Sequence, residues 1–428
     1  MRKKIGLHWF RKDLRLKDNP SLSSLASHVD ELVCVYLLDE VTVLEHSVSP
    51  SNKELLGEHR ANFIHQALID LDILLQRFGQ QLIVLENSSL TPLLNVIDSL
   101  GITDVSAEWH CGFNEQNQWC ELISLRPQLS FIQKNGSTLF EESQFPFSIE
   151  NLPASFSPFR KKVEKYCQVE VLDEPIKTMP ASNISDLSFD SIEIKSLSTS
   201  ESHYAALAGG ETKALEQLKY YLWDTDLITT YKETRNGLDG WEFSSKFSAW
   251  LAQGCISPKR IYHELSQYEA ERTKNKSTYW LFFELLWREF FHWNHFAHKA
   301  TLFSRSGVQG VAKASSFDLK TMQSWQQGHT GYPIVDACMR QLFATGFMSN
   351  RGRQLVASCF VHELGQDWRY GASYFEFQLV DFDVASNWGN WQYLAGVGSD
   401  PRGHRQFNLV KQTQIYDPKQ KFITHWLV

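Results

Sequence analysis

The chain has 428 residues, of which 43% are hydrophobic, and its formal net charge is −7. That length indicates two or three domains rather than one small core, and the acidic balance excludes a uniformly basic nucleic-acid-binding protein. Any contact with nucleic acid would depend on a local basic surface. Aromatic residues make up 13% of the chain and include 14 tryptophans, an enrichment that needs its own explanation.

The cysteines and the N-terminus bear on the compartment. The seven cysteines are scattered and contain no C-x-x-C pair, which argues against a disulfide framework, a zinc ribbon or an iron–sulfur cluster. The basic start MRKKIGLHWFRKDLRL is not followed by a long apolar core, and no apolar run approaches the roughly 20 residues of a membrane span. We expect a cytoplasmic protein without a membrane span or a metal site.

In the first third of the chain, short apolar strands alternate with helices. The strand-like stretches are KIGLHWF, ELVCVYLLD, QQLIVLE and DVSAEW, the first around Ile5 to Phe10, and Lys53 to Phe78 has helical spacing. This alternation predicts an α/β domain with a parallel sheet over residues 1–130. No G-x-G-x-x-G follows the first strand, so the Rossmann dinucleotide fingerprint is missing.

The sequence changes character after Phe131. Five prolines between residues 146 and 180 interrupt any long element, and the stretch ASNISDLSFDSIEIKSLSTSES is rich in serine. We therefore expect a surface connector over residues 131–202. Beyond it, ETKALEQLKYYLWD, TYWLFFELLWREFFHWNHFAH and PIVDACMRQLFATG have helical periodicity, which predicts an all-helical domain over residues 203–428.

An aromatic and amide-rich stretch, SNWGNWQYLAGVGSDPR, begins at Ser386. Trp388, Trp391 and Tyr393 lie here among asparagine, glutamine and glycine, whereas a packed core would use aliphatic residues. The composition indicates a flat ligand with polar edges, a surface that stacks bases, or rings that carry electrons.

The stretch Tyr279 to Phe296 is predicted to be a helix of a large core, with nine aromatic residues among its 18. Glu284, Trp287, Arg288 and Phe291 fall on one face of it, at spacings of three and four residues. Burying an unpaired carboxylate or guanidinium is costly. Either a ligand or a structural network of ion pairs must therefore meet this face.

Two further segments carry charges in apolar surroundings. Asn350, Arg351 and Arg353 begin an apolar helix, and Asp381 and Asp383 follow in LVDFDVASN. We expect the two aspartates to pair with these arginines, either to lock two helices together or to lie beside a cofactor.

The segment SSKFS, Ser244 to Ser248, follows a turn and precedes a helix. Its hydroxyls and backbone N–H groups would suit a phosphate, or would form an ordinary helix cap. His292, His295 and His298 are spaced by three residues with no accompanying ligand pattern, so we do not expect a metal there.

The segment from Asp400 to Lys421 carries five Lys and Arg residues against two Asp residues, a local excess of +3 in an acidic chain. Basic residues beside exposed rings are typical of surfaces that bind single-stranded nucleic acid. A solvated charged tail is the alternative interpretation.

The motifs together resemble the photolyase/cryptochrome flavoproteins, and most closely the DASH cryptochromes. They are HWFRKDLRLKDNPSL near the N-terminus, then WREFF, GYPIVDACMRQLFATGFMSNRGRQ, DVASNWGNWQYLAGVGSDPR and QFNLVKQ. The resemblance covers nearly the whole chain. It implies an α/β antenna domain and a helical domain that holds FAD.

The resemblance also implies roles for individual residues. Contacts to FAD are implied for Tyr231, Ser244, Ser245, Lys246, Phe247, Ser248, Glu284, Arg288, Asn350, Arg353, Asp381, Asp383 and Asn387. Contacts to a pyrimidine dimer or to DNA are implied for Trp287, Tyr393, Glu284, Asn350, Arg235 and Arg405. Within these sets, Arg353 and Asp381 resemble the salt bridge beside the isoalloxazine, and Asn387 the residue that faces flavin N5.

The implied electron-transfer route runs through Trp391 and Trp368, but Ser315 stands where relatives have the distal tryptophan. Trp325 or Phe317 is the alternative ring, or photoreduction is impaired. Asn114 and Glu115 match the Asn-Glu pair of a folate antenna site, such as that for 5,10-methenyltetrahydrofolate, although the accompanying Cys-Lys pair is missing around residues 301–303.

The resemblance implies light-driven repair of cyclobutane pyrimidine dimers, mainly in single-stranded DNA, by electron transfer from excited reduced FAD. Asn350 occupies the position where the (6-4) branch has a histidine, which disfavours (6-4) repair. The second hypothesis is a blue-light photoreceptor with little repair activity. If the protein is a repair enzyme, we expect a monomer that acts on DNA.

Overall fold

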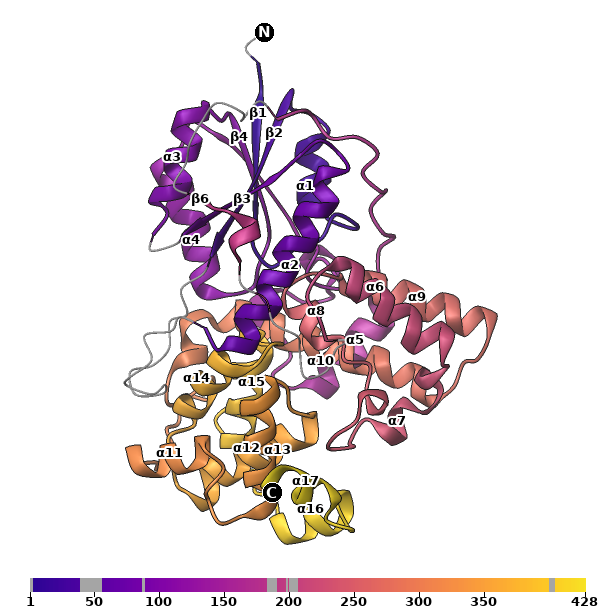
Figure 1. The fold of residues 1–428 in the computed structure, drawn as a ribbon, viewed down its shortest axis with the longest axis vertical. Coiled ribbons are helices and arrows are strands. Elements are labelled where there is room, and N and C mark those ends of the chain that lie inside the picture. The colour runs from indigo at the N-terminus through magenta and orange to yellow at the C-terminus, as the bar shows by residue number, and fades with distance from the viewer. Residues whose placement is uncertain are drawn as a thin grey trace.

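The computed structural model describes residues 3–38, 56–86, 89–182, 191–197, 199, 207–399 and 405–428. An α/β domain that contains the N-terminus lies at one end of the molecule, and a helical domain that contains the C-terminus lies at the other (Figure 1). Of the basic C-terminal segment, Asp400 and Arg402 lie outside the described residues.

The N-terminal domain is built on one six-stranded sheet with the strand order β5-β4-β1-β2-β3-β6. Its strands are β1 (Ile5–Phe10), β2 (Glu31–Leu38), β3 (Leu82–Glu86), β4 (Asp104–Glu108), β5 (Ser130–Lys134) and β6 (Ser191–Ile192). The first five run parallel, and β6 pairs antiparallel with β3. The predicted parallel α/β domain is therefore confirmed.

Helices cover both faces of this sheet because its strands are apolar on both sides. Val33, Val35 and Leu37 of β2 pack with α3 and α4, while Cys34 and Tyr36 pack with α1 and α2. The helices are α1 (Pro20–Ala26), α2 (Glu58–Gln76), α3 (Thr91–Leu100) and α4 (Phe113–Leu125). The helix predicted from Lys53 to Phe78 corresponds to α2, and residues 53–55 lie outside the described residues.

The segment expected as a connector has structure of its own. Strand β5 extends the sheet past residue 130, and β6 adds an edge strand from within residues 131–202. Helix α5 (Phe156–Tyr166) packs against the helical domain. Part of the serine-rich stretch, residues 183–190, 198 and 200–202, lies outside the described residues.

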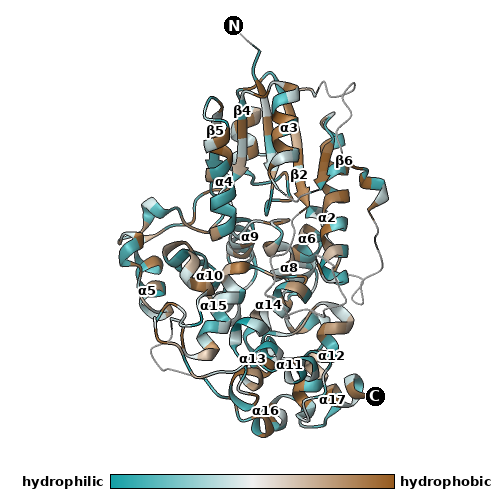
Figure 2. Ribbon diagram, turned by 90° about the vertical axis from the view of Figure 1, so that its left-hand side faces the viewer, coloured by the Kyte–Doolittle hydropathy of each residue, from teal (hydrophilic) through white to brown (hydrophobic). Residues whose placement is uncertain are grey.

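From residue 207 onward, the regular structure of the described residues is helical, apart from one isolated bridge between Ser316 and Gln366. The helices are α6 (Glu211–Lys219), α7 (Tyr231–Thr234), α8 (Ser248–Ala252), α9 (Pro258–Glu271), α10 (Lys276–His298), α11 (Leu319–Gln326), α12 (Pro333–Thr345), α13 (Asn350–Ser358), α14 (Trp368–Gln378), α15 (Val384–Ala395), α16 (Leu409–Tyr416) and α17 (Lys421–Leu427). Figure 2 shows hydrophilic and hydrophobic residues alternating along these helices, as expected for amphipathic elements.

Helix α10 is central to the helical domain. The side chain of Asn275 caps its first turn by accepting hydrogen bonds from the backbone of Ser277 and Thr278. Helix α15 crosses it so closely that a Cβ on Gly389 would lie 2.4 Å from the Phe291 ring. Glycine at this position therefore allows the two helices that carry Glu284, Trp287, Arg288, Asn387, Trp391 and Tyr393 to meet.

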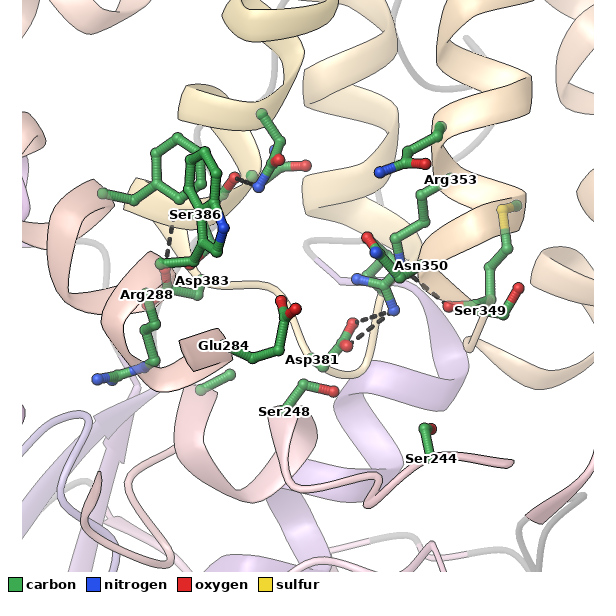
Figure 3. Close-up of a pocket in the computed structure, with 18 of the residues that line it drawn as sticks. Ser244, Ser248, Glu284, Arg288, Ser349, Asn350, Arg353, Asp381, Asp383 and Ser386 are labelled. Carbon is green, nitrogen blue, oxygen red and sulfur yellow. Dashed lines mark hydrogen bonds and ion pairs between the residues drawn. The ribbon is translucent and has the colours of Figure 1, made fainter. Parts of the chain in front are cut away.

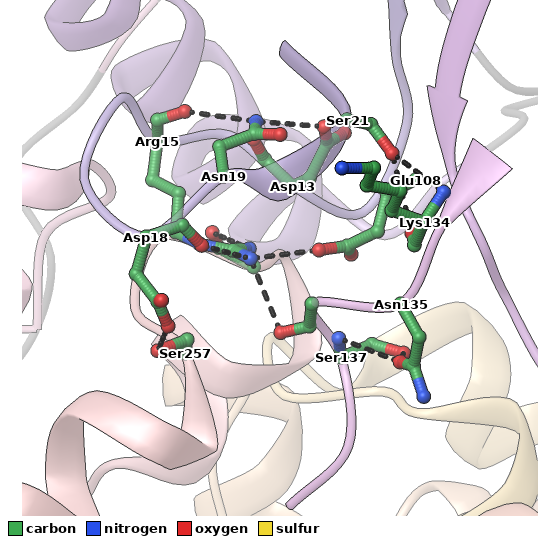
Figure 4. A network of polar contacts seen from close by, with 12 residues as sticks. Asp13, Arg15, Asp18, Asn19, Ser21, Glu108, Lys134, Asn135, Ser137 and Ser257 are labelled. Carbon is green, nitrogen blue, oxygen red and sulfur yellow. Dashed lines mark hydrogen bonds and ion pairs between the residues drawn. The ribbon is translucent and has the colours of Figure 1, made fainter. Parts of the chain in front are cut away.

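A buried polar network joins the two domains (Figure 4). The guanidinium of Arg15, 1% exposed, donates to Glu108 at 2.7 Å and to the carbonyl oxygens of Gly136 at 3.1 Å and Gly254 at 3.0 Å. The hydroxyl of Ser257, which caps α9, donates to Asp18. Because these groups come from the sheet, the connector and the helical domain, the network fixes the domains relative to each other.

Candidate active site and cofactor cavity

A cavity of about 470 Å³ opens into the helical domain between α8, α10, α13 and α15. It brings together nearly all the site residues predicted from the sequence. Those that line it are Tyr231, Arg235, Ser244, Ser245, Lys246, Phe247, Ser248, Glu284, Trp287, Arg288, Asn350, Arg353, Asp381, Asp383, Asn387, Trp391, Tyr393 and Arg405. Trp368, Asn114 and Glu115 are not among the lining residues.

The predicted face of α10 is confirmed, since Glu284, Trp287, Arg288 and Phe291 all line the cavity. Glu284 accepts a hydrogen bond from Arg235, which follows α7. Burial raises the pKa of the Glu284 carboxyl, and the nearby Arg235 partly offsets that rise. An ion pair and a ligand-sized space therefore occur together on this face.

Arg353 and Asp381 form an ion pair inside the cavity, in which one guanidinium nitrogen contacts both carboxylate oxygens (Figure 3). The Nη2 atom of Arg353 lies 2.9 Å and 2.8 Å from the two carboxylate oxygens. The Asp381 side chain is only 1% exposed. A charge pair held in this way keeps both ions oriented before any ligand arrives.

The second predicted pairing is wrong. Asp383 accepts a hydrogen bond from Nε2 of His292 at 2.8 Å and caps α15 by accepting one from the Ser386 N–H at 2.7 Å. Burial opposes ionisation of Asp383, but His292 and Arg288 outweigh it and hold the pKa of this carboxyl well below its usual range. Arg351 instead donates to Asn236 and lies over the Tyr416 ring. The physical reason is that α10 and α15 cross at this point, which no local sequence pattern reveals.

The Ser244–Ser248 segment lines one wall of the cavity. Helix α8 spans only five residues and has no side-chain cap. The polar groups of this wall are therefore the serine hydroxyls and Lys246 rather than a helix terminus. Lys246 adopts a left-handed backbone conformation with φ 60° and donates to the Gly240 carbonyl at 3.0 Å. Burial lowers the pKa of its ammonium group to about 8, so an anion here would stabilise its charged form.

The amides of α15 form another part of the cavity lining. The Nδ2 atom of Asn387 donates to the Ala372 carbonyl at 2.9 Å, and that of Asn390 donates to the Ser386 carbonyl at 2.7 Å. These bonds fix the orientation of both side chains, which present polar edges to the cavity.

Two aromatic rings face each other at the edge of the cavity. Trp287 and Tyr393 lie with their centroids 6.0 Å apart and nearly perpendicular, at 81°. Phe156 of α5 stacks on Trp287 at 3.8 Å, and the guanidinium of Arg405 lies 4.3 Å from the Tyr393 centroid. Both rings are half-buried, an arrangement that suits stacking on another flat group.

Trp391 of α15 and Trp368 of α14 lie on two helices that pack against each other. Trp391 is 2% exposed and packs on α14 at Gly371, where a Cβ would lie 2.3 Å from its indole. Trp368 is three residues before Gly371, and its Nε1 donates to the Arg305 carbonyl at 3.3 Å. Arg305 in turn donates to the Ser315 hydroxyl at 3.0 Å. Arg305 thus contacts Trp368 through its backbone and Ser315 through its side chain.

The two alternative rings lie in different places. Trp325 is fully buried and 6.2 Å from Trp391, so it has no contact with solvent. Phe317 stacks on Tyr370 at 4.0 Å, and both are half-buried. Trp368 also lies 5.7 Å from Trp388. Trp325 therefore contacts Trp391 without reaching solvent, whereas Phe317 is partly exposed and contacts Tyr370.

Asn114 and Glu115 lie at the start of α4, near the other end of α10. The carboxylate of Glu115 is 3.7 Å from His110, and the Phe113 N–H donates to His295 at 3.1 Å. His295 packs against Phe303 at 5.6 Å, so the segment around residues 301–303 is nearby.

No cluster of metal-ligating side chains occurs among the described residues. No helix in the described part of the chain is long and apolar enough to cross a membrane.

Sequence reasoning missed several cavity residues. Phe283, Gln354, Ser386 and Asn390 also line the cavity. Phe283 lies four residues before Trp287 on α10, so the helical spacing could have found it. Phe156 carries no such signal, because it reaches Trp287 from the connector.

Comparisons with known proteins agree with this geometry. The family model "FAD binding domain of DNA photolyase" matches residues 280–428, and the "DNA photolyase" model matches residues 6–181. The Cryptochrome DASH of Vibrio parahaemolyticus is 47% identical over 100% of this chain and 94% of its own length. The chain belongs to the DASH cryptochromes.

Solved structures support the same membership. The crystal structure of a Synechocystis cryptochrome matches with a TM-score of 0.92 and 37% identity, covering 100% of this chain and 89% of that one. A class III photolyase from Agrobacterium tumefaciens matches with a TM-score of 0.84 and 27% identity, covering 100% and 87%. The α10–α15 wall of the cavity therefore lies within an FAD-binding domain.

Proposed function

We propose that this DASH cryptochrome is a light-driven lyase that splits cyclobutane pyrimidine dimers, mainly in single-stranded DNA. The observation that carries the proposal is the ring pair Trp287 and Tyr393 at the edge of an FAD-type cavity. The two rings are in edge-to-face contact with each other, and together they would offer two apolar surfaces at right angles on which an extruded dimer could pack. A dimer in an unpaired strand needs less energy to leave its stack than one in a duplex.

The residues that line the cavity fit FAD. Ser244 to Ser248 would hold its phosphates and ribityl chain, with Tyr231 and the Lys246 ammonium nearby. Arg353, Asp381 and Asn387 would contact the isoalloxazine, and Arg288 and Asp383 would support the same region. In total, five cations and three carboxylates face the cavity, a balance that favours a ligand with a pyrophosphate.

When bound and reduced, FAD supplies an electron after excitation by light, and the protein supplies orientation and electrostatics. Trp287 and Tyr393 would hold the dimer against the cavity, with Glu284 and Asn350 at its polar edge. Arg235 and Arg405 would bind the phosphates on either side. The buried Trp391 and Trp368 would carry electrons between the protein surface and the cavity when the cofactor has to be reduced.

The decisive experiment is a repair assay with dimer-containing single-stranded and double-stranded oligonucleotides, in blue light and in the dark. We expect dimer loss only in light, with the single strand repaired faster. Protein that carries reduced FAD and leaves dimers intact in both substrates would contradict the proposal.

A blue-light photoreceptor is the second candidate, favoured by the cryptochrome names of the relatives and by Ser315 in the electron route. The same assay separates the two, since a receptor changes its flavin spectrum in light without repairing dimers. Asn114 and Glu115 would hold a folate antenna in either case, and loss of a near-ultraviolet folate band in Glu115→Ala would test that.

A further inference from the structure

An aromatic and basic surface continues from the edge of the cavity along α10, away from Trp287. Phe283 lies one helical turn before Trp287 and still lines the cavity. Its ring stacks on Trp280 with centroids 4.6 Å apart and an interplanar angle of 27°. Both rings are half-buried. We refer to Trp280 and Phe283, with the cations around them, as the rim platform.

Three cations from two other elements surround these rings. The Lys232 ammonium on α7 lies 4.8 Å from the Trp280 centroid, and the Arg235 guanidinium lies 5.6 Å from it. The Arg160 guanidinium on α5 lies 5.3 Å from the Phe283 centroid. Helices α5 and α7 both pack against α10, and α5 lies beside α10 in both views of the molecule (Figures 1 and 2).

Helix α5 adds charge to this side of the molecule. It carries Arg160, Lys161, Lys162 and Lys165 against one carboxylate, Glu164. Lys161, Lys162 and Lys165 are exposed. The whole chain has a net charge of −7, so the positive charge of this helix is a local feature. Packing of the helix does not require exposed lysines beside the stacked rings, which suggests that the charge serves to bind a partner.

Internal contacts account for only part of this surface. Arg235 is paired with Glu284, and Tyr279 donates to Glu164 while accepting from Arg160. Among the described residues, no carboxylate forms an ion pair with Lys232, and its ammonium lies over the Trp280 ring instead. A strand of nucleic acid offers both groups that this surface accommodates, since its bases stack on rings and its phosphates attract cations.

We infer that the rim platform binds the unpaired nucleotides on one side of the dimer. A flanking base would stack on the outer face of the Phe283–Trp280 pair in place of the cation that now lies over that ring. Lys232 and Arg160 would turn from the rings to the phosphates that follow. This inference rests on the proposed function, because it takes the strand to enter the cavity between Trp287 and Tyr393. The rim platform would then account for the preference for single strands. A base that is paired and stacked within a duplex cannot also stack on a protein ring.

The test uses single-stranded oligonucleotides that contain one dimer. One has almost no flank, one is extended by five nucleotides on the 5′ side only, and one is extended equally on the 3′ side only. Kd is measured for each at several salt concentrations. In the wild-type protein, extension on one side should tighten binding at least about fivefold, the lower end of what one base stacked on an aromatic ring contributes.

Trp280→Ala should remove that gain while leaving the Kd of the short oligonucleotide unchanged, and Trp280→Phe should retain most of it. Lys232→Ala should lower the salt slope for the extended strand by about one phosphate contact. The matched controls are Phe343→Ala, whose ring is 67% exposed on α12, and Lys213→Ala on the surface of α6. Flavin content and thermal melting report whether each variant folds.

The outcomes separate this inference from the proposed function. An equal gain for both extensions, or a gain that survives in Trp280→Ala, would overturn the platform even if the wild-type protein repairs dimers. A one-sided gain that Trp280→Ala abolishes supports the platform. That result would stand even if repair failed, and only the lyase proposal would then be withdrawn.

Discussion

The floor and the mouth of the cavity are built differently. At the floor, the side chains of Asp381 and His292 are each 1% exposed and hold charged or polar partners in fixed geometry, and one of those partners, Arg353, is 24% exposed. At the mouth, Arg235 and Glu284 are 20% and 27% exposed, and the rings of Trp287 and Tyr393 are half-buried. The floor fits a ligand that stays bound, and the mouth fits one that comes and goes.

The difference has a physical basis. A buried ion pair is costly to disturb because either ion alone would remain desolvated. A partly exposed pair or ring can exchange its protein contacts for water or substrate with little loss. Substitutions at the floor should therefore affect stability and cofactor retention, whereas substitutions at the mouth should affect substrate binding.

The largest effect is expected for Asp381→Asn at the floor. It leaves the Arg353 guanidinium without its carboxylate partner, and we expect a loss of about 3 kcal/mol in the free energy of unfolding, together with a loss of bound FAD. Chemical denaturation and flavin absorbance measure the two effects. The control is Glu216→Gln, which breaks the exposed pair with Lys213 and should cost less than about 1 kcal/mol. Equal losses in the two variants would remove the distinction between floor and mouth.

Trp391→Phe tests the floor without removing a charge. The variant should slow the light-driven reduction of oxidised FAD, because Trp391 is the buried ring next to α14. Repair by chemically pre-reduced protein should be nearly unchanged, since that reaction needs no external electron. Time-resolved absorbance of the flavin and a repair assay give the two rates. Trp223→Phe, outside the cavity lining, is the control, and unchanged photoreduction in Trp391→Phe would place the route elsewhere.

Many residues of the floor and the mouth could be predicted from the sequence. The pattern that reveals them differs from one element to another. Helical spacing alone placed Glu284, Trp287, Arg288 and Phe291 on one face, and the cavity confirms it. Strand and helix alternation gave the sheet, but not β6, whose two residues pair only because the chain returns to β3.

The pairings across the cavity were harder to predict. The local pattern allowed several Arg–Asp combinations, and only the family resemblance singled out Arg353 with Asp381. The partner of Asp383 proved to be His292. Partner choice depends on how α10 and α15 cross, which is a property of tertiary packing. Phe156 on Trp287 depends in the same way on the docking of α5.

At the mouth, Tyr393→Ala should weaken discrimination between damaged and undamaged single strands by about 1–3 kcal/mol, the usual contribution of a ring that stacks on a base. Unfolding free energy and FAD content should hardly change. Binding titrations with and without one dimer measure the effect. Full discrimination in the variant would mean that the dimer does not lie on this ring.

Arg405 and Tyr393 are in contact, so their effects are coupled. The guanidinium lies 4.3 Å from the ring centroid, and the double substitution should differ from the sum of the single ones by at least about 0.5 kcal/mol. Arg405→Ala alone should weaken binding to both kinds of strand and lower the salt slope by about one phosphate contact. Strict additivity would indicate that the substrate separates the two side chains.

Lys246 links the stability of the floor and the affinity for the ligand to pH, because both depend on the charge of its ammonium group. Burial lowers the pKa of this ammonium group to about 8 in the folded protein, against about 10.4 in an unfolded chain. Between these values the unfolded chain holds the proton and the folded chain does not, so the stability of the FAD-free protein should rise with pH. FAD affinity should fall over the same range, because the phosphates would lose their cation. Isothermal titration and denaturation from pH 7 to about 10 give the two slopes, and Lys246→Met should reduce both. Slopes that are the same in Lys246→Met as in the wild-type protein would show that this lysine does not face the phosphates.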